Sequence, residues 1–292
     1  NRPNGTYLAA LPPDGKHVWW FADTDGDEFG RWMCEPFMAT TSIPTPALPG
    51  VPDGYPAGLA IGRIVIAAGT STDDGSRIWL RRGDEPPTVV YEHTEDADVG
   101  ALSEDDRLLA IGHSEHGDSR HPAIRVLNTA DGSVVGEKFD GPGRGLTPLA
   151  FAPIPGDSRL LVIHERRGRD ELLIWDVLAD TEFEVPIDLP GELSGDFFPD
   201  GESLLVWHTH AARTRLYRYN LATGELTELP TAAGCIGSAE ARPDGTVEYT
   251  CSSSAFPPSI RALHPDGTDR IVVTPPGDPA PPSVPVQDLW VD

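Results

Sequence analysis

The fold of this chain is decided by the stretch from Leu102 to Phe139, LSEDDRLLAIGHSEHGDSRHPAIRVLNTADGSVVGEKF. An acidic turn leads into the apolar run LLAIG, a charged loop leads into AIRVL, and a TADG turn leads into SVVGEKF. Short apolar runs bounded by Gly, Asn and Asp are typical of β-strands joined by tight turns. The stretch therefore predicts consecutive antiparallel strands.

The same unit recurs along the chain. Its opening turn and strand return as LPPDGKHVWWF, APIPGDSRLLVIH, FPDGESLLVWH and RPDGTVEYTC, and PAGLAIGRIVIAAGT marks one further unit. The acidic turns are 91, 52, 43 and 44 residues apart, and the first interval holds two units. Four antiparallel strands at this period are typical of β-propeller blades, with a pair of β-sandwiches as the alternative. The acidic turn residues are Asp14, Asp105, Asp157, Asp200 and Asp244.

We predict an all-β fold, a β-propeller of six four-stranded antiparallel blades over residues 1–275. The 30 Gly and 30 Pro among 292 residues favour short strands and turns over long helices. The last strand is expected to end near Val273, and residues 276–292 form a Pro-rich connector whose stiffness suits a tether. The blades are expected to begin near Thr6, Tyr55, Ala97, Gly145, Glu192 and Ile236.

The excess of acidic over basic residues argues against negatively charged partners. With 22 basic and 46 acidic residues the net charge is −24, so most of the surface would repel a polyanion. We therefore expect no nucleic acid and no membrane as partners. The sequence has no long apolar run, and its start lacks both a signal-peptide pattern and an initiator Met. We expect a cytoplasmic protein and a chain that is not the complete gene product.

The three cysteines do not form a disulfide framework. If the PDG turn at 243–245 closes a hairpin, Cys235 and Cys251 lie on one face of adjacent strands, one diagonal step apart. Pairing of these two thiols is one interpretation. Free thiols are the expected state, because the composition is typical of an intracellular protein.

The acidic segment WWFADTDGDEFGRW at 19–32 has two interpretations. Asp23, Asp25 and Asp27 occupy the first, third and fifth positions of an EF-hand calcium loop. The sixth position needs Gly but holds Glu28, and the twelfth needs Glu but holds Cys34. The segment therefore predicts a solvated loop between two strands, and we expect no metal and no cofactor.

The loops between second and third strands are the expected contact surface. ADTDGDEFG, TSTDDGS, HSEHGDSRHP, HERRGRDE, HTHAARTR and SSSAFPPS are longer and more charged than the PDG turns, which lie on the opposite rim. Such a rim fits a docking surface or an entrance for peptide termini, and simple solvation of exposed loops is the alternative. Arg166 and Arg167 are candidate substrate contacts. The loops of the first two blades are acidic, whereas those of the fourth and fifth blades also carry Arg169, Arg213 and Arg215.

We expect no catalytic residue in this chain. The G-x-S-x-G elbow of an α/β-hydrolase is absent from the sequence. His208 and His210 alternate on one strand face, yet no third metal ligand follows at a sensible spacing. Adjacent carboxylates such as Glu104 with Asp105 lie in turns, where acidic side chains cap backbone amides. The remaining clustered histidines, His113, His116 and His121, are interpreted as loop or strand-end residues without metal.

Several stretches resemble the prolyl oligopeptidase family of serine peptidases, in particular its actinobacterial acylaminoacyl peptidases and dipeptidyl aminopeptidases. They include WWFADTDGDEFGRWMCEPF, LLVIHERRGRDELLIWDVLADTE and the closing PPSVPVQDLWVD, and the likeness extends over essentially the whole chain. The resemblance implies a propeller that precedes a C-terminal α/β-hydrolase domain, which would be the partner of this chain within one polypeptide. The catalytic Ser, Asp and His of the family would then lie beyond Asp292.

The resemblance also implies a function. In the family the propeller admits short peptides and excludes folded proteins, and in some members a propeller carboxylate holds the amino terminus of the substrate. Glu28, or Asp27 beside it, is the candidate for that role here. Most family propellers have seven blades, and the count of six is explained if an N-terminal blade has been cut away. A free-standing propeller that binds a protein or peptide is the alternative, and a propeller with its own metal or carboxylate site is a third interpretation.

Overall fold

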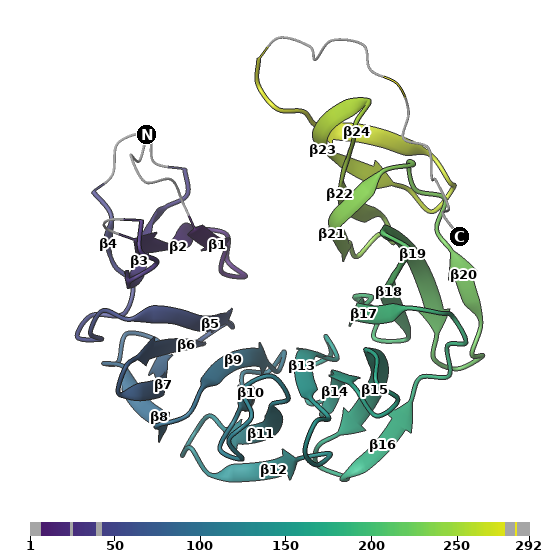
Figure 1. Cartoon of the computed structure of the whole chain (residues 1–292). Coiled ribbons are helices and arrows are strands. Elements are labelled where there is room, and N and C mark those ends of the chain that lie inside the picture. The colour runs from purple at the N-terminus through teal and green to yellow at the C-terminus, as the bar shows by residue number, and fades with distance from the viewer. Residues whose placement is uncertain (1–6, 24–25, 39–42, 278–283, 285–292) are drawn as a thin grey trace. The chain divides into compact units, whose positions relative to one another are not determined.

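The computed structural model describes residues 7–23, 26–38, 43–277 and 284. The regular structure in this part of the chain is entirely β-strand, with no helix among the described residues. The strands form six four-stranded antiparallel sheets, each built from four consecutive strands in chain order (Figure 1). These sheets are β-propeller blades, which confirms the predicted fold class and the predicted number of blades.

The first three blades cover the N-terminal half of the chain. Blade 1 contains β1 (Tyr7–Ala10), β2 (His17–Asp23), β3 (Gly30–Pro36) and β4 (Thr45–Pro46). Blade 2 contains β5 (Tyr55–Ile61), β6 (Val65–Thr72), β7 (Gly75–Arg82) and β8 (Thr88–His93). Blade 3 contains β9 (Ala97–Leu102), β10 (Leu108–His113), β11 (Ala123–Asn128) and β12 (Val134–Lys138).

The other three blades follow the same plan. Blade 4 contains β13 (Leu146–Phe151), β14 (Arg159–His164), β15 (Glu171–Asp176) and β16 (Thr181–Glu184). Blade 5 contains β17 (Glu192–Phe197), β18 (Ser203–His210), β19 (Arg213–Asn220) and β20 (Leu226–Glu228). Blade 6 contains β21 (Cys235–Ala241), β22 (Val247–Ser253), β23 (Phe256–Leu263) and β24 (Asp269–Val273).

The blade boundaries agree closely with the repeat read from the sequence. Blades 2, 3 and 5 begin at the predicted residues, blades 4 and 6 begin one residue away, and the last strand ends at Val273. The predicted start of blade 1 at Thr6 lies outside the described residues. Most of the predicted connector, residues 278–283 and 285–292, also lies outside them.

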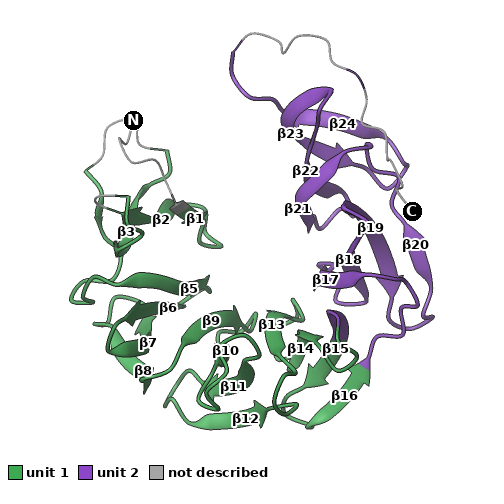
Figure 2. Cartoon of the chain, viewed as in Figure 1, with its two compact units in different colours: residues 1–168, 173–183 green, residues 169–172, 184–292 purple. Residues whose placement is uncertain are grey.

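The chain divides into two compact units, which Figure 2 shows in different colours. Unit 1 comprises residues 1–168 and 173–183, and unit 2 comprises residues 169–172 and 184–292. Each unit has its own apolar interior.

In unit 1 the core consists of apolar layers between consecutive blades. Trp19, Phe21 and Trp32 of blade 1 pack against Ile66 and Ala68 of blade 2. The alternate residues of β6 face blade 3 instead, so that both faces of this strand are covered and its apolar run is continuous. Burial of each large side chain contributes about 1.5–3 kcal/mol. The layer between blades 3 and 4 includes Ala110, Ile124, Val126, Leu160, Val162 and Trp175.

In unit 2 one apolar layer joins blades 5 and 6. Leu205 and Leu216 of blade 5 pack with Val247, Tyr249 and Leu263 of blade 6. Tyr249 is buried, and its hydroxyl donates a hydrogen bond to the carboxylate of Asp269 at 2.9 Å. Burial and this carboxylate raise the pKa of Tyr249 to about 12.

One buried carboxylate ties blade 3 to blade 2. The Asp106 side chain accepts hydrogen bonds from the backbone N–H groups of Arg63, Ile64 and Val65, at 3.1, 2.6 and 3.1 Å. Asp106 has a φ of +60°, which is uncommon for a residue other than Gly. A Cβ on Gly62 would come within 1.8 Å of the Asp106 Oδ1 atom. Gly62 is therefore required by the close approach of this carboxylate.

A β-bulge decides the geometry of two cysteines. Between Ile236 and Ala239 the register of β21 against β22 shifts, so that Cys235 lies opposite Ser252 and Cys251 lies opposite Ile236. Successive residues of a strand point to opposite faces, so the two thiols face away from each other. Cys235 is exposed and Cys251 is buried, both as free cysteines. The same-face arrangement expected from a regular hairpin is therefore wrong.

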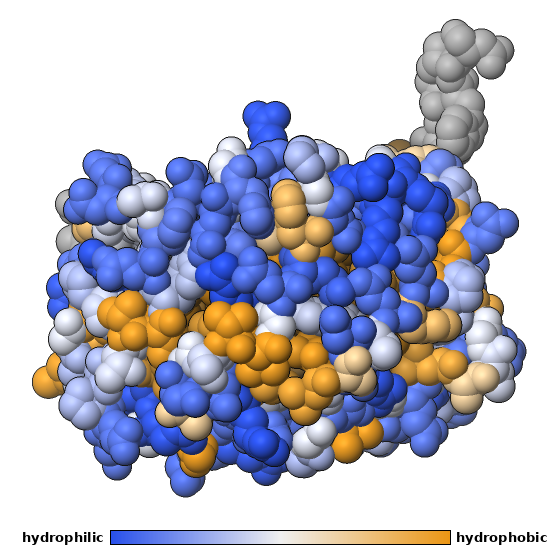
Figure 3. Space-filling model, turned by 90° about the horizontal axis from the view of Figure 1, so that it is seen from below, coloured by the Kyte–Doolittle hydropathy of each residue, from blue (hydrophilic) through white to orange (hydrophobic). Residues whose placement is uncertain are grey.

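The surface is mostly hydrophilic, with apolar patches. Figure 3 shows such patches among hydrophilic residues on one side of the molecule. Some of the exposed apolar residues of unit 1 lie on the fourth strands of its blades, where Val89, Val134 and Phe183 are about half exposed. No described helix is long and apolar enough to span a membrane.

Candidate functional site

The connection between the second and third strand of each blade defines what we call the loop side of that blade. The sequence predicts longer loops here, and blades 1, 3 and 4 have them, at residues 24–29, 114–122 and 165–170. Blades 2, 5 and 6 instead have two-residue hairpins, because the flanking strands continue pairing to the tip. Polar sequence alone does not distinguish a long loop from a long hairpin. The hairpins are at residues 73–74, 211–212 and 254–255.

The described part of the acidic loop in blade 1 is a turn held by its own carboxylates. Asp23 accepts hydrogen bonds from the N–H groups of Gly26 and Glu28, at 2.6 and 3.0 Å. Asp27 accepts one from the N–H of Phe29 at 3.1 Å. The side chains of Asp27 and Glu28 are exposed, and Glu28 has a φ of +63°. The two predicted acidic site residues therefore lie at the tip of a turn that points into solvent.

Two contacts fix this loop against blade 2. The rings of Phe29 and Tyr55 meet edge to face with centroids 5.3 Å apart. The Arg31 guanidinium lies 2.6 Å from the Asp53 carboxylate, and the backbones of Gly30 and Gly54 form a β-bridge. The acidic tip thus stands on a rigid base, which is how a binding loop is usually positioned.

The two predicted basic residues, Arg166 and Arg167, differ in their environments. Arg166 is half-buried, and its guanidinium forms ion pairs with Asp140 at 2.6 Å and Glu182 at 2.8 Å. Burial alone would raise the pKa of Glu182, but hydrogen bonds from Lys138 and Arg166 outweigh it and lower the pKa. Arg167 is exposed, at the tip of the blade 4 loop. Arg166 is therefore committed to the fold, whereas the side chain of Arg167 is exposed to solvent.

The acidic and basic pairs belong to different blades. Asp27 and Glu28 follow β2 in blade 1, and Arg166 and Arg167 follow β14 in blade 4. Each blade presents its own charge on its loop side, as the sequence predicts. The structure places these two pairs on separate blades.

The loop side of blade 3 carries an ionic network that the sequence analysis missed. The Arg125 guanidinium donates to both carboxylate oxygens of Glu115, at 2.6 and 3.0 Å, and lies 2.8 Å from Glu137. The hydroxyl of Tyr91 donates to Glu115 at 2.9 Å. Hydrogen bonds from Arg125 and Tyr91 lower the pKa of Glu115 to about 2. Cross-strand alternation around the TADG turn would have predicted the Arg125–Glu137 pair, whereas nothing in the sequence indicates Tyr91 of blade 2.

A histidine joins the loop sides of blades 3 and 4. His121 Nδ1 lies 2.7 Å from the Asp118 carboxylate, and its Nε2 lies 3.9 Å from Glu165. Glu165 also accepts a hydrogen bond from the backbone N–H of Gly145 at 2.6 Å. The arrangement is a structural clasp between neighbouring loops.

Buried histidines lie at or near the ends of the second strands of three blades. His113, His164 and His208 are each less than a tenth exposed. Burial, with a contribution from Arg125, lowers the pKa of His113, so this side chain is neutral in the folded protein at pH 7. Within the described residues, no three His, Cys, Asp or Glu side chains are grouped so that they could hold a metal ion.

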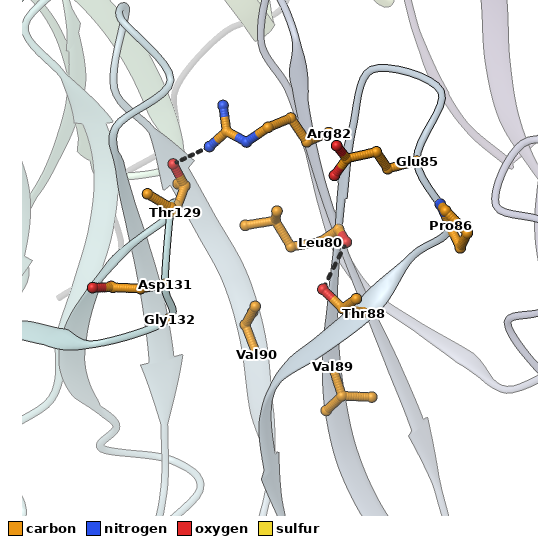
Figure 4. Close-up of a pocket in the computed structure, with 11 residues that line it drawn as sticks. Leu80, Arg82, Glu85, Pro86, Thr88, Val89, Val90, Thr129, Asp131 and Gly132 are labelled. Atoms are coloured by element: carbon orange, nitrogen blue, oxygen red, sulfur yellow. Dashed lines mark hydrogen bonds between the residues drawn. The ribbon is translucent and has the colours of Figure 1, made fainter.

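Two described hollows of unit 1 lie on the opposite edge of the blades, where first strands turn into second and third into fourth. Figure 4 shows a groove of about 330 Å³ between β8 and the turn after β11. Leu80 and Val90 point into it, and Arg82 donates to the Thr129 hydroxyl across it at 3.1 Å. A second groove, of about 670 Å³, lies between blades 1 and 2 and includes Trp19 and Arg81. Nothing in the sequence indicates either groove, because each combines residues from two blades.

Comparisons with known proteins identify the fold. No protein-family model matches the sequence, and no curated protein matches it. One similar solved structure is a prolyl endopeptidase, from a study of inter-domain dynamics in catalysis and specificity, with a TM-score of 0.67 and 16% sequence identity. Another is TolB from Acinetobacter baumannii, with a TM-score of 0.55 and 15% identity.

The coverage of these structures is unequal. The prolyl endopeptidase match covers 92% of this chain but only 42% of the endopeptidase, so this chain spans about two fifths of its length. The TolB match covers 91% of this chain and 67% of TolB. At these identities the similarity shows the fold alone. This chain has a β-propeller fold like that found in part of a prolyl endopeptidase.

Proposed function

We propose that this chain is the substrate-gating and docking propeller of a serine peptidase that hydrolyses short peptides. The observation that carries the proposal is the structural match, in which nearly the whole chain corresponds to less than half of a prolyl endopeptidase. On this proposal the remainder of the polypeptide is a C-terminal α/β-hydrolase domain that supplies the nucleophile. The propeller contributes the charged loops between the second and third strands of its blades, which would contact the termini of peptide substrates.

Labelling with a fluorophosphonate, which reacts with activated serine nucleophiles, tests this proposal. The native gene product in source-cell lysate would be compared with the purified 292-residue chain. We expect a labelled band on the order of twice the mass of this chain and no labelling of the isolated chain. A native product no larger than this chain, and unlabelled, would refute the peptidase proposal.

Within the proposed peptidase, the exposed acidic tip of blade 1 is proposed to attract the amino terminus of the substrate. Glu28 and Asp27 support this role because both side chains are exposed and are positioned by a turn on a rigid base. Glu28→Gln should raise KM for peptides with a free amine more than for N-blocked peptides. Equal effects on both kinds of peptide would contradict the role, and Asp14→Asn, in a turn at the other edge of blade 1, is the matched control.

The alternative is a free-standing propeller that binds a protein or peptide. The similarity to TolB supports this alternative, because nearly the whole chain also matches a protein that is not named as a peptidase. The labelling experiment distinguishes the two functions, since only the first requires a serine nucleophile in the native product.

A further inference from the structure

Strand β7 of blade 2 ends with two consecutive arginines, Arg81 and Arg82. Successive residues of a strand point to opposite faces, so the two side chains reach different neighbouring blades. Arg81 Nη1 donates to the carbonyl of Ala47, which follows β4 of blade 1, at 2.7 Å. Arg82 Nη2 donates to the Thr129 hydroxyl of blade 3 at 3.1 Å. Each arginine therefore lines a different one of the two grooves of unit 1.

The charge of Arg81 is not neutralised within the described part of the chain, where its partners are a backbone carbonyl and an aromatic ring. Other partly buried arginines of unit 1 each lie 2.6 Å from a carboxylate oxygen, as Arg125, Arg159 and Arg166 do. A partly buried charge without a counter-ion is unfavourable, and a chain with 46 acidic residues could have supplied one. Arg81 is thus available to pair with an anion from outside the chain.

Blade 1 holds the Arg81 guanidinium in a fixed orientation. Its Cζ lies 5.6 Å from the centroid of the Trp19 ring, a favourable cation–π distance, and Trp19 is itself 3% exposed. A guanidinium has five N–H groups, and the described residues accept one hydrogen bond from it, through Nη1 to Ala47. The Nε atom is buried without a hydrogen-bond partner among the described residues. The group is therefore preorganised, with donors still unused.

The walls of the groove between blades 1 and 2 are held by backbone hydrogen bonds. On blade 2, the N–H of Gly83 donates to the carbonyl of Ile64 at 2.7 Å, and the Asp106 carboxylate fixes the same turn. On blade 1, the N–H of Gly15 donates to the carbonyl of Pro12 at 2.9 Å. The groove is therefore formed before any ligand binds, as small-molecule sites usually are.

Much of the lining of this groove is apolar. Trp19 and Ile66 are less than a tenth exposed, whereas Ile64 is 55% exposed. Pro12 and Ile61 also line the groove. Its volume of about 670 Å³ is within the range usual for small-molecule sites, which are lined mainly by apolar and aromatic side chains. We therefore expect a ligand with an apolar body.

The charges around Arg81 favour a ligand with a single negative charge. The acidic lining residues are Asp14 and Asp84, both exposed, and the second arginine of the lining, Arg63, already pairs with Glu104. Together with the net charge of −24, these carboxylates would repel a dianion or a polyanion. A carboxylate carries one charge, and its two oxygens match the N–H groups of a guanidinium.

We propose that the groove between blades 1 and 2 binds a small monocarboxylate with an apolar body. Arg81 binds the carboxylate, and Ile61 and Ile64 contact the apolar body. The groove lies at the edge of the blades opposite the loop side, and its use requires neither peptidase activity nor a hydrolase domain. The proposal therefore goes beyond the proposed function, and each can fail without the other.

Titrations of the 292-residue chain followed by NMR chemical shifts test the proposal. The probes are hydrocinnamate, which joins a phenyl ring to a carboxylate, its neutral amide hydrocinnamide, and acetate, which has the charge without the apolar body. The backbone N–H signals of Gly62 and Gly83 report on this groove. The signal of Gly132 reports on the other groove, shown in Figure 4.

Three variants accompany the titrations. Arg81→Gln removes the cation. Arg82→Gln is the matched control, because this neighbouring arginine also has no ion pair with a described residue but lines the other groove, which has about half the volume and no aromatic residue in its described lining. Ile64→Glu adds a negative charge at an exposed position and leaves Arg81 in place. Thermal unfolding shows whether each variant is folded, and Ile64→Glu decides the outcome if Arg81→Gln is not.

We expect hydrocinnamate to shift the signals of Gly62 and Gly83 and not that of Gly132. Its binding should be at least tenfold weaker in Arg81→Gln, because a charge-assisted hydrogen bond is lost, and at least fivefold weaker in Ile64→Glu. Arg82→Gln should bind within twofold of the unmodified chain. Hydrocinnamide and acetate should each bind at least tenfold more weakly than hydrocinnamate.

Four results would overturn the proposal. They are the absence of any shift of Gly62 and Gly83 with hydrocinnamate, equal binding of hydrocinnamide, equal binding of acetate, and unchanged binding by folded Arg81→Gln or Ile64→Glu.

Discussion

Two arginines on third strands, Arg125 of blade 3 and Arg215 of blade 5, show how one fold can use the same residue in opposite ways. Arg125 is 16% exposed and is bound by two carboxylates within 3.0 Å, whereas Arg215 is 59% exposed and is 3.7 Å from one. The first neutralises charge inside a network that spans two blades. The second leaves positive charge on a surface whose overall charge is negative. Ion pairing, more than residue type, therefore separates an arginine that stabilises the fold from one that contributes little to its stability.

Among the variants that test this difference between the two arginines, Glu115→Gln is expected to cause the largest loss of stability. The substitution leaves the half-buried Arg125 with one carboxylate instead of two, so unit 1 should lose on the order of 3 kcal/mol of unfolding free energy. Urea unfolding followed by tryptophan fluorescence measures it, since five of the seven tryptophans belong to unit 1. Arg215→Gln is the control and should change stability by less than about 0.5 kcal/mol. Similar losses in both variants would remove the distinction between the two arginines.

The pH dependence of stability provides a second test of the ion pair between Glu115 and Arg125. The pKa of Glu115 is lowered to about 2, so its stabilising contribution is present above its ordinary pKa of 4.5 and is lost as the pH falls towards 2. Between pH 5 and pH 2.5, the unmodified chain should therefore lose about 2 kcal/mol more than Glu115→Gln. Unfolding free energies at a series of pH values measure the difference. Parallel pH profiles would show that Glu115 is not tied to Arg125 in solution.

The same difference between a paired and an exposed arginine is expected within one loop of blade 4, where Arg166 and Arg167 are adjacent. Arg166→Gln removes the partner of Asp140 and Glu182 and should cost about 1–2 kcal/mol. Arg167→Gln changes an exposed side chain and should stay within about 0.5 kcal/mol. Chemical denaturation of the two variants gives both values. A reversed order would mean that Arg167, and not Arg166, is the residue that stabilises the fold.

The smallest expected effect has the opposite sign. Ala211→Asn with Ala212→Gly supplies the residues that a type I′ turn favours and should stabilise unit 2 by about 1 kcal/mol. Thermal unfolding of the double variant measures the gain. Ala255→Gly, in the two-residue connection of blade 6, provides a control at another hairpin tip. A loss of stability at blade 5 would show that the alanines are not strained there.

Much of the fold could be predicted from the sequence because each blade carries its own turn signals. The acidic turns and the apolar runs beside them are local patterns, and they located five of the six blade starts within one residue. The start of blade 1 at Thr6 stays a prediction. Local patterns failed where one extra residue mattered, as in the bulge after Ile236 that moves Cys235 and Cys251 to opposite faces.

The candidate site could be predicted only in part, for a related reason. The exposed acidic residues Asp27 and Glu28 were recognisable from a dense local cluster of carboxylates. The role of Arg166 depends on Asp140, 26 residues earlier in the chain, and on Glu182 of the fourth strand. Partners that are brought together by the stacking of blades leave no periodic signal. The two grooves were missed for the same reason.

The carboxylate of Asp106 has a consequence for how the chain can be divided. Repeat architectures are often described as modules whose stabilities add through nearest-neighbour terms. Here three amide groups at the start of β6 obtain their hydrogen bonds from a residue of the next blade, at the position that Gly62 leaves open. A fragment that ends after blade 2 would expose these donors and lose the cooperative link. Blade duplication or truncation in this protein is therefore viable only at boundaries where each blade carries its own acceptor.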